Sequence, residues 1–266
     1  MPDAYNGAVR LAYDRDGPPD ADTVVFVAGL GYGRWMWRWQ REALGAYEAV
    51  LWDNRGTGDS ATPEGPYTVD QMAADLGAVI DDAGIGSAHV VGASMGGMIA
   101  QRFALADDRV ASLTLLCTTP GGPKAVPTPE ATRARIYDVP DGLDERETRR
   151  HKMRPAMSNE FWTENDDLVE QIIDWRIESD ASEQAIAWQA AAVAEFDVAD
   201  RLGEIRVPTL VVHGTDDRVV PVENGRLLAD GLSNAEYHEL DGAPHLCFIE
   251  RADTVNDLLR GFLDDV

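Results

Sequence analysis

Lysine and cysteine are scarce in this chain of 266 residues. Only Lys124 and Lys152 among its 23 basic residues are lysines, and its two cysteines are Cys117 and Cys247. Two cysteines are too few for a disulfide framework, which excludes the small disulfide-rich secreted class. We therefore expect two buried thiols, or a redox-active pair if folding brings the two side chains together.

Long apolar runs are also missing. No run approaches the roughly 20 apolar residues that a membrane-spanning helix needs. Met1 is followed by PDAYNGAVR, which lacks the apolar segment of a signal peptide. The sequence therefore predicts a soluble, cytoplasmic protein that does not act on a membrane.

Positive charge is low relative to negative charge. The chain has 47 acidic residues and a net charge of −24. Such a surface repels nucleic acid and anionic membranes, which excludes both as partners. An acidic, lysine-poor surface resembles that of proteins from salt-loving organisms, so we hypothesise that the protein is halophilic and works in concentrated salt. The alternative is a surface that is merely acidic.

Short β-branched runs alternate with helical patterns along the chain, which predicts an α/β fold with a mostly parallel sheet. The run TVVFVAG is apolar throughout, as expected for a strand that is covered on both faces. The predicted strands are Val9–Tyr13, Val24–Ala28, Tyr47–Trp52, His89–Gly92, Ser112–Thr118, Thr209–His213 and Ala235–Leu240. Helical periodicity predicts helices over Trp35–Ala46, Thr68–Ala83, Ser94–Ala106 and Ala252–Leu263.

The composition shifts after Thr119, where PGGPKAVPTPE is typical of a linker. No strand pattern appears from Glu130 to about Glu195. We therefore predict a core formed by residues 1–119 and 197–266, with residues 120–196 inserted as a helical cap. Three cap tryptophans, Trp162, Trp175 and Trp188, either line an apolar substrate pocket or pack the cap onto the core.

The segment HVVGASMGGMIAQRFA predicts a strand, a sharp turn and a helix. Its turn carries a Gly-x-Ser-x-Gly motif centred on Ser94. In this arrangement the serine hydroxyl projects above the sheet edge, and backbone strain leaves room only for glycine two residues to either side. The helix N-terminus below the turn offers free N–H groups. Ser94 is therefore the predicted nucleophile.

A serine that attacks an acyl group needs N–H donors for the oxyanion that forms. One predicted donor is Met95, directly after the nucleophile, and the other is Leu30, in the glycine-rich loop after TVVFVAG. A dinucleotide fingerprint is the rival interpretation of this loop, because Asp53 ends the next strand. That fingerprint needs glycine at position 34, which is Arg34, so we set it aside.

A serine hydroxyl becomes reactive when a base takes its proton and a carboxylate orients that base. Asp217 follows the strand TLVVHG and is the predicted acid, with its neighbour Asp216 as a weaker candidate. His245 lies in a loop before the last helix and is the predicted base. The order serine, acid, histidine is the one expected for this kind of sheet. The other four histidines fall in strands or in the cap.

These motifs resemble those of the α/β-hydrolase superfamily almost from end to end. The matching pieces are VFVAGLGYG, WDNRGTGDS, VVGASMGG, VPTLVVHGTDDRVVP and GAPHLCFIERADTVN. The resemblance implies the α/β-hydrolase fold, and a structural role for Arg55 and the glycines around it. Within the superfamily the chain looks most like serine carboxylesterases, enol-lactonases and methyl esterases that use no cofactor.

The predicted function is hydrolysis of a carboxylic ester or lactone through an acyl-enzyme, with a small-molecule ester or lactone as the substrate. The oligomeric state stays open. No cofactor and no metal are expected, because no ligand spacing such as HExxH occurs. Two alternatives stay open. One is a cofactor-free perhydrolase or haloperoxidase-like enzyme with the same three residues. The other is a small-molecule sensor built on a hydrolase fold.

Overall fold

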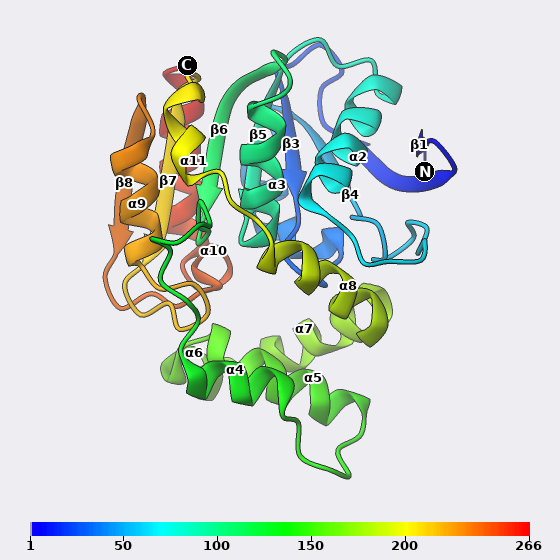
Figure 1. The fold of residues 1–266 in the computed structure, drawn as a ribbon, viewed down its shortest axis with the longest axis vertical. Helices are drawn as coiled ribbons and strands as arrows, with labels where there is room; N and C mark the ends of the chain where they lie inside the picture. Colours follow the sequence, from blue (N-terminus) through cyan, green and yellow to red (C-terminus); the bar gives the residue numbers. More distant parts are fainter. Residues whose placement is uncertain (1) are drawn as a thin grey trace.

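The computed structural model describes residues 2–266, which form an eight-stranded sheet with helices on both faces (Figure 1). The sheet order is β1-β2-β4-β3-β5-β6-β7-β8. All neighbours from β4 to β8 are parallel, while β1 and β2 are antiparallel additions at one edge. The strands are β1 (Asp3–Asn6), β2 (Val9–Asp16), β3 (Thr23–Val27), β4 (Glu48–Trp52), β5 (Ala88–Ala93), β6 (Val110–Leu116), β7 (Thr209–Gly214) and β8 (Ala235–Leu240).

The mostly parallel sheet predicted from the sequence is confirmed, and each predicted strand is present with small shifts at its ends. Side chains of the central strands alternate between two apolar clusters. Val25 and Val27 of β3 belong to one cluster, whereas Val24 and Phe26 belong to the other. This alternation follows from the two-residue repeat of a strand and shows that both faces of the sheet are buried.

Helices cover both faces of the sheet. The cluster on one face includes residues of α2 (Val69–Asp82) and α3 (Met95–Ala104), and the cluster on the other includes residues of α11 (Ala252–Asp264). Thr68 caps α2 as predicted, and Gln71 completes a capping box with it. The predicted helix over Trp35–Ala46 is instead a 3₁₀ turn, η1 (Arg34–Trp37), followed by a short helix α1 (Arg38–Ala43).

Between β6 and β7 the chain leaves the sheet and forms a group of helices at the end where the parallel strands terminate (Figure 1). No strand interrupts this group between residues 130 and 195 of the described chain. Its helices are α4 (Glu130–Tyr137), α5 (Glu145–Met153), η2 (Arg154–Ala156), α6 (Asn159–Glu164), α7 (Asp166–Ser179) and α8 (Glu183–Ala194). We refer to residues 120–196 as the cap.

The chain returns from the cap through η3 (Ala199–Glu204) into β7. Helices α9 (Glu223–Gly231) and α10 (Cys247–Glu250) complete the fold. Among residues 2–266, no helix has both the length and the apolar character needed to cross a membrane.

Candidate active site

Ser94 lies in the sharp turn between β5 and α3, with φ 54° and ψ −121°. Positive φ is uncommon for a residue with a side chain and marks stored backbone strain. Two hydrogen bonds hold the turn in this conformation. The Ser94 N–H donates to the carbonyl oxygen of Leu116 at 2.9 Å, and the hydroxyl of Thr118 donates to the Ser94 carbonyl oxygen at 2.6 Å.

The two motif glycines are required by close backbone packing around this turn. A Cβ atom on Gly92 would collide with the backbone of Gly96, and a Cβ atom on Gly96 would collide with the carbonyl of Val27 at the end of β3. Any larger residue would therefore push the turn away from the sheet. The steric reason that the sequence indicated for the Gly-x-Ser-x-Gly spacing agrees with this packing.

The loop after β3 passes directly beside the serine. A Cβ atom built on Gly29 would lie only 3.6 Å from the Cβ of Ser94. Within residues 2–266, the backbone N–H groups of Leu30 and Met95 donate to no protein acceptor. Both residues line the same cavity as Ser94. The two N–H groups are therefore available to a ligand in that cavity.

Asp217 and His245 form a buried hydrogen-bonded pair. The Nδ1 of His245 lies 2.7 Å from the Oδ2 of Asp217, and the backbone N–H groups of Val219 and Val220 donate to Oδ1, each at 2.8 Å. Burial raises the pKa of Asp217, but His245 and His213 outweigh burial and lower it to about 2. Because the ionised carboxylate only accepts, His245 Nδ1 is the donor, so Nε2 carries the lone pair whenever the imidazole is neutral.

The structure brings Ser94 and His245 into the lining of one cavity of about 480 Å³. In the part of the chain that is described, no hydrogen bond joins the Ser94 hydroxyl to His245. Such a contact is often loose without substrate and tightens in the complex. Asp216 is exposed at the same turn, with its side chain turned to solvent, which favours Asp217 over its neighbour.

His213, which the sequence indicates only as a structural residue at a strand end, contacts the same carboxylate. Its Nε2–H donates to the carbonyl oxygen of Val220 at 2.8 Å and lies 3.3 Å from the Oδ2 of Asp217. Burial lowers the pKa of His213, and the carboxylate of Asp217 more than offsets burial and raises it. Asp217 is thus held between two imidazoles. The only signal of this contact in the sequence is the position of His213, four residues before Asp217.

Cys117 and Cys247 are close neighbours behind this pair. Both thiols are buried and free, with 3.4 Å between the two Sγ atoms. Burial raises the pKa of Cys117. Among the described residues, Cys117, His213 and Asp217 have donor atoms within 4.8 Å of one another and are of types that bind metals. However, the Nε2–H of His213 donates to a carbonyl oxygen. This nitrogen therefore has no lone pair with which to bind a metal ion.

Gln189 of α8 is a contact that sequence reasoning missed. Its buried side-chain amide accepts from the N–H of Gly31 at 2.8 Å and donates to the Arg55 carbonyl at 2.9 Å and the Thr57 hydroxyl at 3.0 Å. One cap residue thereby fixes the loop that carries Leu30. A single glutamine in an alanine-rich helix gives no local signal of this role.

The turn around Arg55 is structural, in line with the resemblance. Arg55 forms two buried hydrogen bonds with the carboxylate of Asp75, at 2.6 and 2.7 Å. The carboxylate of Asp53 accepts from the backbone N–H groups of Arg34 and Asp59. Asp53 is therefore already engaged and does not resemble the acidic residue that binds a ribose in a dinucleotide site.

The expectation that cap tryptophans line the substrate pocket is wrong for this cavity, because none of Trp162, Trp175 and Trp188 belongs to its lining. Trp162 packs between the guanidinium groups of two arginines. Trp175 packs against Trp35, with 5.6 Å between ring centroids, and Trp188 packs against Tyr67 at 5.5 Å. Trp175 and Trp188 thus join the cap to the core, while the ring contacts of Trp162 are with arginines of the cap itself.

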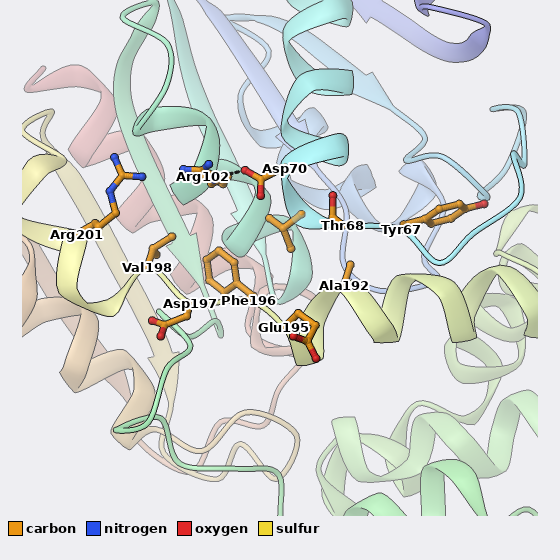
Figure 2. A pocket seen from close by; sticks show the side chains of 11 residues that line it. Tyr67, Thr68, Asp70, Arg102, Ala192, Glu195, Phe196, Asp197, Val198 and Arg201 are labelled. Carbon is orange, nitrogen blue, oxygen red and sulfur yellow. Dashed lines mark hydrogen bonds and ion pairs between the residues drawn. The ribbon is translucent and has the colours of Figure 1, made fainter.

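A second cavity, of about 310 Å³, lies between α2, α3 and the end of α8 (Figure 2). Asp70 and Arg102 face each other there and form an ion pair. The hydroxyl of Thr68 accepts from the N–H of Gln71, and the hydroxyl of Tyr67 donates to a backbone carbonyl. The lining contains no histidine or cysteine. This cavity therefore offers no nucleophile with a base beside it.

A family model described as the alpha/beta hydrolase fold matches residues 22–252. The chain belongs to the α/β-hydrolase family. This α/β hydrolase is 32% identical to "Putative carbamate hydrolase RutD" of Azorhizobium caulinodans, over all of this chain and 99% of that protein. It is 31% identical to "Putative non-heme bromoperoxidase BpoC" of Mycobacterium tuberculosis, over 97% of this chain and 99% of that protein.

Solved structures give the same result for this α/β hydrolase. The enol-lactonase from Burkholderia xenovorans LB400 superposes with a TM-score of 0.84 at 29% identity, over 99% of this chain and 100% of that one. The superfamily and fold predicted from the sequence are thereby confirmed. The relatives differ in the reactions that their names describe, so the family alone does not define the substrate.

Proposed function

We propose that this α/β hydrolase cleaves a carboxylic ester or a lactone through an acyl-enzyme, with Ser94, His245 and Asp217 as its catalytic residues. One observation carries the proposal. Ser94 and His245 line one cavity, while Asp217 binds the Nδ1 side of His245 from outside that cavity. The likeness to an enol-lactonase over nearly the whole chain supports the ester or lactone bond as the target.

In the first step the Nε2 of His245 takes the proton of the Ser94 hydroxyl, and the oxygen attacks the carbonyl carbon of the substrate. The N–H groups of Leu30 and Met95 stabilise the negative oxygen that forms. His245 then gives its proton to the leaving alcohol. In the second step His245 deprotonates a water molecule, which attacks the acyl-enzyme. The bond to the Ser94 oxygen breaks, and His245 returns the proton to that oxygen. Asp217 stabilises the imidazolium in both steps.

The test is the substitution Ser94→Ala, assayed with p-nitrophenyl acetate and a small lactone. Without the nucleophile, kcat should fall by about 10⁶-fold or to the background of the assay, as expected for a catalytic set of this kind. Ser87→Ala is the matched control, because Ser87 is exposed at the opposite end of β5 and should leave the rate unchanged. Near-normal hydrolysis by Ser94→Ala would refute the proposal.

A perhydrolase is the second candidate, and the likeness to a protein named as a non-heme bromoperoxidase favours it. The same acyl-enzyme forms, but hydrogen peroxide attacks it in place of water and releases a peracid. Product analysis in mixtures of water and peroxide distinguishes the two. A peracid yield far above the share expected from the peroxide concentration would favour the perhydrolase.

A further inference from the structure

The cavity that contains Ser94 has an unusual charge for this molecule. The charged side chains in its lining are Arg133, Lys152 and Arg176, and no aspartate or glutamate lines it. The chain as a whole has about twice as many acidic as basic residues and a net charge of −24. The lining of this cavity is therefore positively charged in a molecule whose overall charge is strongly negative. This difference indicates a specific role for the three cations.

Arg176 of α7 is the deepest of these cations, with only 6% of its surface exposed. Its Nε–H donates to Asp180 at 2.7 Å, and its guanidinium lies 4.3 Å from the ring centre of Tyr32. Within residues 2–266 its two terminal NH₂ groups have no acceptor, although Arg176 lines the cavity. A buried guanidinium with free donors is costly unless an anion or water binds it.

Asp180 does not cancel this positive charge. The same carboxylate accepts from the Nε1–H of Trp35 at 2.9 Å and lies 3.9 Å from a second guanidinium, that of Arg149. One carboxylate thus faces two guanidinium groups. The other acid near them, Glu145, lies 3.8 Å from Arg149 and is 63% exposed, so water screens that pair, and the buried groups keep one positive charge in excess. An excess of one matches a singly charged anion, such as a carboxylate, better than a doubly charged phosphate ester.

The other two cations lie nearer to solvent. Arg133 of α4 is exposed and its side chain has no acceptor in the described part of the chain. Lys152 pairs at 2.8 Å with Glu183, which is 77% exposed, so water screens that interaction. Arg133 and Lys152 therefore give the outer part of the cavity a positive potential that attracts anions.

We propose that the substrate is an ester or lactone that also carries a carboxylate, and that Arg176 binds this carboxylate with its two terminal NH₂ groups. This inference rests on the proposed function of Ser94. A planar guanidinium matches the two oxygens of a carboxylate and forms charge-assisted hydrogen bonds with them. Apolar side chains such as Met98, Val193 and Phe248 line the same cavity. A short hydrocarbon chain between the carboxylate and the reacting carbonyl fits that lining.

The experiment compares two esters that differ only in this charge, mono-(4-nitrophenyl) adipate and its methyl-capped diester, by release of nitrophenol. For the wild-type protein we expect kcat/KM to be at least tenfold higher for the free acid. Equal or higher kcat/KM for the capped ester would overturn the substrate class while leaving the proposed function intact. No Ser94-dependent release from either compound would refute the proposed function itself.

Substitutions then locate the carboxylate site. In the double variant Arg176→Gln/Asp180→Asn, which removes both charges of the buried pair, the preference for the free acid should fall to about one. Arg226→Gln is the matched control, because Arg226 is an exposed, ion-paired arginine on α9 outside the cavity. It should keep the wild-type preference. An unchanged preference in the double variant would overturn the role of Arg176.

Arg133→Gln keeps the inference testable if the buried double variant does not fold. Because Arg133 is exposed and unpaired, this variant should keep the wild-type melting temperature. We expect its preference for the free acid to fall two- to fivefold, mainly through a higher KM. No change in KM for the free acid would contradict the role of the outer cations.

Discussion

At the scale of single residues, Asp217 contacts two histidines, and only one of them faces the cavity. His245 lies between Asp217 and the cavity, whereas His213 approaches the same Oδ2 from within the core. A carboxylate fixed from two sides has little freedom to rotate, so its contact with His245 is maintained when the imidazole becomes charged. In the proposed mechanism His213 is thus a positioning residue that acts through Asp217.

The substitution His213→Leu should lower kcat roughly tenfold with little change in KM, because the polar contact of Nε2–H with the charged Asp217 is lost. His213→Gln should recover part of this loss, since its amide N–H can reach the place of the imidazole Nε2–H. Steady-state kinetics on p-nitrophenyl acetate measure both. His238→Gln is the control, because His238 pairs with Glu236 on β8, outside the cavity. Equal kcat for the Leu and Gln variants would contradict this role.

At the scale of elements, α8 is joined to the loop after β3 by the amide of Gln189. The N–H of Gly31 and the carbonyl of Arg55 both depend on this amide for a partner. A second contact of the cap reinforces the first, because the N–H of Ala181 donates to the carbonyl oxygen of Gly31 at 2.9 Å. The cap therefore helps to hold the backbone of Gly31, which directly follows Leu30.

We expect Gln189→Leu to lower the free energy of unfolding by about 1–3 kcal/mol, since it leaves buried backbone groups without partners. It should also lower kcat roughly tenfold, because the Leu30 N–H loses its fixed position. Chemical denaturation and steady-state kinetics measure the two effects. Gln184→Leu, at an exposed position of the same helix, should change neither. Loss of stability with unchanged kcat would show that the loop keeps its position without Gln189.

The sequence predicted well those elements whose bounds depend on interactions within the element itself rather than on contacts with distant parts of the chain. The predicted and observed bounds of β8 coincide, and Thr68 caps α2 through local hydrogen bonds. β1 was missed because Asp3–Asn6 is short and polar, and it is a strand only through pairing with β2. The helix from Trp35 was predicted as one piece because periodicity does not distinguish a 3₁₀ turn from an α-helix.

The same distinction applies to the site. Ser94 and its flanking glycines carry a local steric signal, and the family order of motifs pointed to Asp217 and His245. Gln189 and Arg176 have no such signal, because their roles come from contacts with residues far away in the chain. For the cap tryptophans, composition left both pocket lining and packing onto the core open, because composition does not tell which face of a helix meets the cavity.

At the scale of the whole molecule, the dominant property is the net charge of −24. Like charges repel one another across the folded surface, and salt screens that repulsion. We expect the melting temperature to rise between 10 mM and 0.3 M KCl. A further rise between 0.3 M and molar KCl would support the hypothesis of a protein that works in concentrated salt. A melting temperature that is constant over the whole range would contradict both expectations.

The scarcity of lysine has a practical consequence for attaching this protein to solid carriers. Lys124 and Lys152 both lie in the cap, and Lys152 lines the cavity that contains Ser94. Aldehyde-coated beads, which couple through side-chain amines, would bind the molecule by the cap, at or near the cavity that Lys152 lines. Beads that couple through carboxyl groups would find attachment points over most of the surface and leave many molecules facing outward.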